Sequence, residues 1–148
     1  MITNTELEYK GDLYPTKIVS YEHEAGSISF YTDNNVILKV TVLNDNLIRF
    51  RFTTKGYFSN DFSYAIDKSH VHGYNFLEVS DEKEYYQIKT SEGKCKIQKI
   101  DMRLSIFDLE GNVILEDELG FHWEESYEFG GNIVKMSKSS KDGECFYG

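Results

Sequence analysis

The length, composition and charge of the chain limit the class of protein that it can be. It has 148 residues, of which 40% are hydrophobic and 15% aromatic, enough for one core but too few for two independent domains. With 25 acidic against 16 basic residues the net charge is −9, so we expect neither nucleic acid nor a membrane surface as a partner. The sequence shows no signal peptide and no apolar run long enough to cross a membrane, and we expect a cytoplasmic protein.

Short runs with a two-residue alternation of apolar and polar side chains recur along the chain, as in β-strands with one buried face. The predicted strands are residues 18–21, 27–32, 35–43, 47–52, 76–80, 84–90, 94–100, 103–108, 112–117 and 132–137. Turn-forming residues such as Asp33-Asn34-Asn35 and Glu110-Gly111-Asn112 separate several of them. No stretch has a convincing helical period, so the pattern predicts an all-β sandwich or barrel with little or no helix.

In two of these strands the alternation predicts which side chains share an apolar face. One apolar face is made of Val36, Leu38, Val40 and Val42, and another of Ile48, Phe50 and Phe52. Arg49 and Arg51 point away from the second face. We expect them to form cross-strand ion pairs with the excess acid, and the alternative is that they bind a carboxylate or phosphate.

Two aromatic-rich stretches, residues 56–74 and 120–132, lack the alternation and are predicted to be irregular loops, where ligand contacts are common. The second holds the only tryptophan. Its residues Trp123, Glu124 and Tyr127 resemble a sugar site, in which an aromatic face stacks on the ring and a carboxylate accepts hydroxyl protons. The alternative is an exposed acidic loop with Trp123 in the core below it.

Other reactive side chains give weaker signals. His122 with Glu124 or Glu125 is the kind of pair that a sugar epimerase would need. His70 and His72 would face the same side of a strand, but no third ligand with suitable spacing is visible, so we expect neither metal nor cofactor. Cys95 lies in an alternating run on the same side as Ile97 and is predicted to be a core residue.

Four stretches taken in order resemble the N-terminal β-sandwich domain of glycoside hydrolase family 31, the α-glucosidase and α-xylosidase family. They are NDNLIRFRFT (44–53), SYAI (63–66), the block from YYQIKT to VILEDE (85–118) and GECFYG (143–148). In this family an acidic residue is followed by an aromatic-Tyr-Gly-Leu-Gly-Glu motif. Its first half is matched by Glu144, Phe146, Tyr147 and Gly148.

The resemblance implies a single N-terminal β-sandwich of the galactose mutarotase-like type over residues 1–148, which stops before the catalytic TIM-like barrel. It implies that the parent is a retaining α-glucosidase-type enzyme that hydrolyses O-glycosyl bonds without a cofactor. The family's two catalytic aspartates lie on the barrel. By carry-over no residue here is catalytic or binds substrate, and the chain alone is predicted to be inactive.

The same resemblance implies the partners. The domain is expected to pack on the catalytic barrel of the parent chain, to support its substrate pocket, and to meet an α-glycoside only through the parent. A sheet edge left unpaired would favour self-association. The alternatives are a free-standing carbohydrate-binding module that uses Trp123 and Tyr127, and an epimerase that uses His122.

Overall fold

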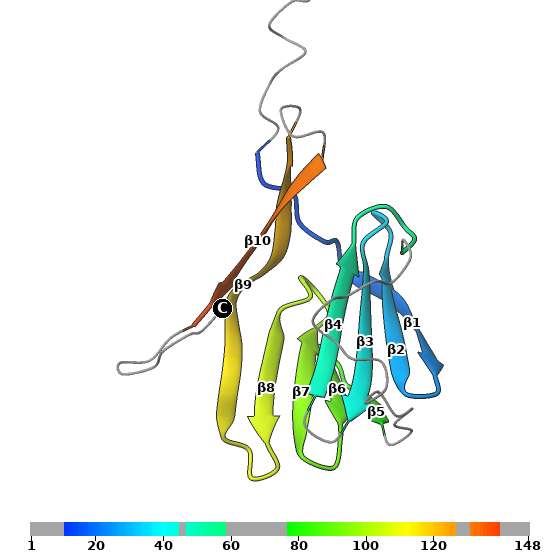
Figure 1. The fold of residues 1–148 in the computed structure, drawn as a ribbon, viewed down its shortest axis with the longest axis vertical. Helices are drawn as coiled ribbons and strands as arrows, with labels where there is room; N and C mark the ends of the chain where they lie inside the picture. The colour runs from blue at the N-terminus through cyan, green and yellow to red at the C-terminus, as the bar shows by residue number, and fades with distance from the viewer. Residues whose placement is uncertain (1–10, 45–46, 59–76, 127–130, 140–148) are drawn as a thin grey trace, which may run out of the picture.

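The structure is a computed structural model that describes residues 11–44, 47–58, 77–126 and 131–139. Within these ranges the chain forms two antiparallel sheets (Figure 1). The first has four strands, in the order β1 (Ile18–Glu24), β2 (Ser27–Thr32), β3 (Ile37–Asn44) and β4 (Leu47–Thr53). The second has six, in the order β10 (Gly131–Lys138), β9 (Val113–Ser126), β8 (Leu104–Asp108), β7 (Gly93–Gln98), β6 (Tyr85–Lys89) and β5 (Glu78–Asp81).

The predicted all-β sandwich is confirmed. Each predicted run contains a strand, and the described residues include no helix. Turns fall at the expected places: Asn35 and Gly111 have φ of 69° and 92°, values in the left-handed region that Asn and Gly adopt most readily. The described elements also include no helix of the length and apolarity needed to span a membrane.

One expectation was wrong: residues 120–126 are not a loop. They are the second half of β9, which runs without interruption from Val113 to Ser126 and pairs with β10. The reason is alternation hidden among the aromatic residues, because Phe121 and Trp123 both enter the core and are only 4% and 6% exposed. SYAI, His70, His72, Tyr127 and residues 144–148 lie outside the described residues, as does most of the other predicted loop.

The core lies between the two sheets and draws on both. The first sheet contributes the predicted face of Val36, Leu38, Val40 and Val42 together with Ile28 and Phe30, and the second contributes Tyr86, Ile88, Cys95, Ile97 and Leu104. Phe30 on β2 is completely buried, and its ring centroid lies 5.0 Å from that of Tyr86 on β6. Aromatic contact across the sandwich therefore ties the sheets together.

The two outward arginines of β4 do not face acids on β3. The register places Lys39 opposite Arg51 and Thr41 opposite Arg49. β3 carries no acidic residue, so it supplies no partner for the expected ion pairs, and their formation with acids elsewhere in the chain stays a prediction. The guanidinium of Arg51 instead lies 4.7 Å from the ring centroid of Phe58.

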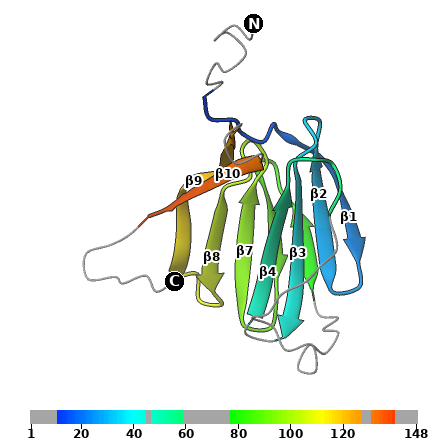
Figure 2. The ribbon, with the colours of Figure 1, turned by 45° about the horizontal axis from the view of Figure 1, so that its top comes forward.

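Residues 11–17 cross one end of the sandwich from the second sheet to the first (Figure 2). At one end Leu13 and Trp123 exchange backbone hydrogen bonds of 2.7 and 3.0 Å. At the other end the Asn34 side-chain amide donates to the carbonyl oxygen of Tyr14 at 3.0 Å. We call this segment the N-terminal strap.

The sheets differ in width, so the larger one extends past the smaller. Figures 1 and 2 show β8, β9 and β10 projecting beyond β4, where the first sheet ends. Exposed apolar side chains gather on this projection. Along β10 and the adjoining part of β9 these side chains are Leu119, Ile133, Val134 and Met136, with exposed fractions of 48%, 37%, 59% and 38%. They lie on both faces of the sheet, since Val134 is opposite the inward Trp123 and Ile133 is opposite the outward Glu124.

Candidate functional site

The structure separates the residues that the sequence grouped as a sugar site. Trp123 points into the core, where its ring lies 5.7 Å from that of Phe121. The next residue, Glu124, points to the opposite face of β9 and forms an ion pair of 2.6 Å with Lys135. Trp123 is thus a core residue, as the alternative interpretation has it, and it presents no ring face to a sugar.

His122 is also built into the fold. It is 5% exposed, its Nδ1 lies 2.8 Å from the carbonyl oxygen of Gly120, and Tyr14 of the N-terminal strap stacks on its ring at 5.2 Å. Glu124 lies on the same face but is held by Lys135. The imidazole and the carboxylate are therefore committed to structural contacts rather than turned toward a shared cleft, as an epimerase would require.

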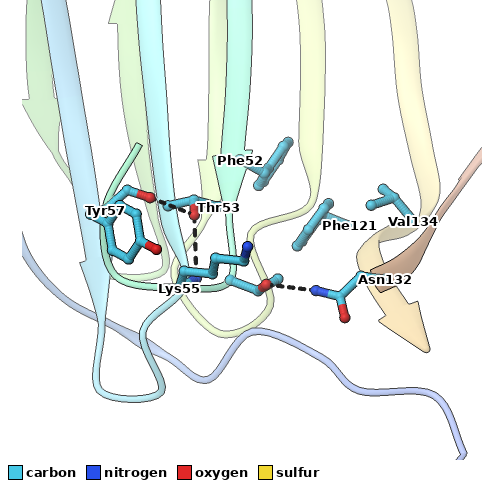
Figure 3. Close-up of a pocket in the computed structure, with 8 residues that line it drawn as sticks. Phe52, Thr53, Lys55, Tyr57, Phe121, Asn132 and Val134 are labelled. Carbon is cyan, nitrogen blue, oxygen red and sulfur yellow. Dashed lines mark hydrogen bonds between the residues drawn. The ribbon is translucent and has the colours of Figure 1, made fainter. Parts of the chain in front are cut away.

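A surface pocket of about 260 Å³ lies between β4 and the β9–β10 pair (Figure 3). Phe52 and Phe121 stack in it with ring centroids 4.3 Å apart and an angle of 3° between the rings. Its polar side has a hydrogen bond of 2.8 Å from the Asn132 amide to Thr54 Oγ1. None of its described lining residues, which are Phe52, Thr53, Thr54, Lys55, Tyr57, Phe121, Asn132 and Val134, has a carboxyl group.

A second hollow of about 280 Å³ lies beside β4 where it passes the end of β8. Ile48, Ile106 and Ile114 give it an apolar lining, and Glu92 is the single acidic residue among its described lining residues. Glycoside hydrolysis uses two carboxyl groups, about 5–10 Å apart. Neither hollow supplies such a pair from the described residues.

Sequence reasoning missed both hollows because they depend on long-range contacts. Phe52 and Phe121 belong to different sheets, and only the tertiary fold brings their rings together. The apolar alternation of β4 correctly indicates that Phe52 points inward, but no local pattern says which residue it meets. The described part of the chain also contains no cluster of three or more His, Cys, Asp or Glu side chains that could hold a metal ion.

A buried carboxylate joins the three strands of the projecting half of the second sheet. The side chain of Asp117 on β9 has no exposed surface; it accepts a hydrogen bond of 2.9 Å from the N–H of Leu104 and one from the ammonium group of Lys138 on β10. A buried charge is tolerated only when it is paired in this way. Asp117 therefore fixes the position of β10 against β9.

Cys95 is the one cysteine among the residues that the structure describes, and its side chain is buried on β7. Burial, followed by the negative charge of Asp117, raises the pKa of the Cys95 thiol from 9.0 to about 12. Its neutral form stabilises the folded state at any pH below about 9, and this contribution is lost as the pH rises from 9 toward 12. We expect a thiol reagent at pH 8 to modify Cys95 only after unfolding in urea.

The thiol experiment uses a Cys145→Ser background so that Cys95 alone is counted. The unfolded protein should react with one equivalent at once, and the native protein should react only at the rate of its unfolding. Immediate modification of the native chain would show that the β7 environment is open.

The fold is that of a two-sheet antiparallel β-sandwich with sheets of unequal width. The sequence profile described as "Glycosyl hydrolase 31 N-terminal galactose mutarotase-like domain" matches residues 37–148. The chain belongs to this family, and the resemblance identified from its motifs is confirmed. A comparison with curated protein sequences finds no significant match.

Solved structures with the same fold include family 31 enzymes. A GH31 α-xylosidase from Xanthomonas citri matches 82% of this chain with a TM-score of 0.68 and 19% sequence identity. A GH31 dextranase from Flavobacterium johnsoniae in complex with glucose matches 76% of this chain with a TM-score of 0.66 and 18% sequence identity. A cycloalternan-forming enzyme from Listeria monocytogenes matches 76% of this chain with a TM-score of 0.59 and 15% sequence identity. The chain spans 14%, 15% and 10% of these proteins, respectively.

Proposed function

We propose that this chain is the non-catalytic N-terminal domain of a retaining, α-glucosidase-type glycoside hydrolase, where it packs on the catalytic barrel and supports the substrate pocket. The observation that carries the proposal is the family match over residues 37–148. The α-glycoside is the substrate of the parent enzyme, and this domain meets it only through the barrel. The catalytic carboxylates belong to the parent as well.

The structure supports a scaffolding role in two ways. The hollows beside β4 lack a pair of carboxyl groups among their described residues, as noted above. The candidate residues His122, Trp123 and Glu124 are engaged in packing or ion pairs. A free-standing carbohydrate-binding module would need an exposed aromatic face. The burial of Trp123 argues against that alternative, and Tyr127 lies outside the described residues.

The proposal predicts that the purified chain releases no nitrophenol from 4-nitrophenyl α-glucoside or α-xyloside above a blank. The longer protein encoded by the same reading frame should hydrolyse at least one of these substrates. A stable signal from the 148-residue chain would overturn the non-catalytic assignment. A longer protein that folds but acts on neither α-glycoside would overturn the assignment of the parent protein as an α-glucosidase-type enzyme.

A further inference from the structure

The outer face of the second sheet carries a group of lysines in a chain that is acidic as a whole. Cys95 and Ile97 of β7 point into the core. Lys94 and Lys96 alternate with them and therefore point outward. On β6 the same alternation turns Lys89 outward, and the register places it directly opposite Lys94. We call Lys89, Lys94 and Lys96 the lysine face.

The lysine face has no acidic partner among the described residues. The ion pairs there are made by other basic residues, which are Lys99, Arg103, Lys135 and Lys138. Glu78 lies opposite Lys89 in the register with β5, but no ion pair joins the two side chains. Like charges directly opposite each other destabilise a sheet. An anion bound between Lys89 and Lys94 would remove this repulsion.

Two aromatic rings hold the third ammonium group of the lysine face in place. Lys96 Nζ lies 4.8 Å from the ring centroid of Tyr85 on β6 and 4.9 Å from that of Phe107 on β8. Both distances suit a cation–π interaction, which restrains the ammonium group without neutralising its charge. Because Lys96 is already restrained, it loses little freedom when it binds an anion, and this favours binding.

The composition of this surface favours a glycan over a protein as the partner. The cores of protein interfaces are depleted in lysine. The neighbours of the lysine face in the register include uncharged side chains with hydrogen-bonding groups, which are Gln87, Gln98 and Ser105. Amide and hydroxyl groups of this kind can bind sugar hydroxyls. Three ammonium groups in addition require a sugar polymer that carries negative charge.

The net charge of −9 opposes an anionic partner only at long range. At physiological ionic strength, charges more than about 8 Å apart are largely screened. Contact is then decided by the nearest groups. The acids that the register places beside this surface stand at its borders, where Glu78 on β5 is opposite Lys89 and Glu116 on β9 is opposite Ser105.

We propose that the lysine face, with Tyr85 and Phe107, binds an acidic polysaccharide whose sugar carboxylates accept hydrogen bonds from the three ammonium groups. This binding role is added to the scaffolding role of the domain and keeps the parent enzyme beside a carboxylate-bearing glycan. The inference rests on the proposed function because it takes a glycan as the partner of a glycoside hydrolase.

Calorimetric titration of the 148-residue chain with a galacturonate oligosaccharide tests the inference. We expect the double variant Lys94→Gln/Lys96→Gln to bind at least about tenfold more weakly than the unchanged chain, because each lost hydrogen bond joins two charged groups. The matched control is Lys17→Gln/Lys55→Gln, which changes the net charge equally at exposed positions in the N-terminal strap and after β4. An equal loss of affinity in the two double variants would overturn the inference.

A single substitution on the neighbouring strand gives a second measurement. Lys89→Gln should also weaken binding of the galacturonate oligosaccharide, because Lys89 lies opposite Lys94. The melting temperature of each variant shows that the sandwich is folded. Unchanged affinity in a folded Lys89→Gln variant would contradict the three-lysine site.

Two other ligands identify the chemistry that the lysine face recognises. Maltohexaose has sugar hydroxyls but no carboxylates, and we expect it not to bind. Polyglutamate has carboxylates but no sugar hydroxyls, and it should bind more weakly than the galacturonate oligosaccharide. Equal affinity for polyglutamate would overturn the inference in favour of an acidic protein partner. Tight binding of maltohexaose, or no binding of the galacturonate oligosaccharide, would overturn it as well.

These outcomes are separate from failure of the proposed function. If the chain binds the galacturonate oligosaccharide but the longer protein hydrolyses no α-glycoside, the lysine face keeps its role and the enzymatic assignment is lost. A longer protein that is an active α-glycosidase, together with a chain that binds no galacturonate, gives the reverse.

Discussion

Replacing Phe30 by Ala is expected to lower the free energy of unfolding by about 3–5 kcal/mol, the usual loss for a buried aromatic residue. Phe30 has no exposed surface, and its ring contacts those of Tyr21 and Tyr86, at centroid distances of 6.2 and 5.0 Å. The substitution leaves a cavity between the two sheets. Because domains are typically stable by only about 5–15 kcal/mol, the variant should lose a large fraction of its free energy of unfolding.

Urea unfolding followed by circular dichroism measures this loss. Tyr57→Ala is the control, since Tyr57 is also a large aromatic residue but is 63% exposed, and surface substitutions usually change stability by less than about 0.5 kcal/mol. Similar midpoints for the two variants would show that Phe30 is not the centre of the core.

The second large effect is expected at Asp117. Asp117→Ala removes the acceptor of the buried Leu104 N–H, and an unsatisfied buried donor costs about 1–3 kcal/mol. It also removes the partner of Lys138, whose side chain is 27% exposed and can recover part of its hydration. Asp117→Asn keeps an oxygen for Leu104 and should lose less stability than the alanine variant.

Two measurements separate a local role from a general one. Urea unfolding gives the total loss of stability. Hydrogen exchange of β10 in the same variant shows whether this strand opens before the rest of the domain. Asp101→Ala is the control. The carboxylate of Asp101 also accepts a hydrogen bond from a backbone N–H, that of Arg103, at 3.1 Å, but this bond lies at an exposed site. Equal losses for Asp101→Ala and Asp117→Ala would contradict the role assigned to the buried carboxylate.

The strands could be predicted from sequence because period-two alternation is a local property. The run from Val36 to Val42 shows this, since every second residue of it is buried as expected. The second half of β9 escaped detection because aromatic and acidic residues are mixed there, and the sequence alone does not distinguish an aromatic loop from an aromatic strand. Burial of Trp123 depends on its pairing with Val134 of the next strand and with Leu13, which is distant in sequence.

The candidate site was less predictable than the fold. Trp123 and Glu124 are adjacent in sequence and were grouped for their chemistry, yet neighbouring residues of a strand point to opposite faces. The pocket at Phe52 and Phe121 and the position of β10 as the last described strand of its sheet arise from how the sheets are stacked and how the strands are ordered. The family was identifiable because several weak motifs occur in the right order. The match of Glu144 to Gly148 with the family motif remains a prediction, since these residues lie outside the described structure.

The N-terminal strap has a consequence for the order in which the domain is assembled. Asp12 and its partner Lys135 are 123 positions apart in the chain, and Leu13 pairs with Trp123 near the other end of the sequence. During synthesis the strap is made before β9 and β10, so its docking site does not exist until these two strands have been added. Contacts between such distant residues form slowly. The strap is therefore made before the strands that it docks on and is among the last described segments to find its place, and until then it remains open to chaperones and proteases.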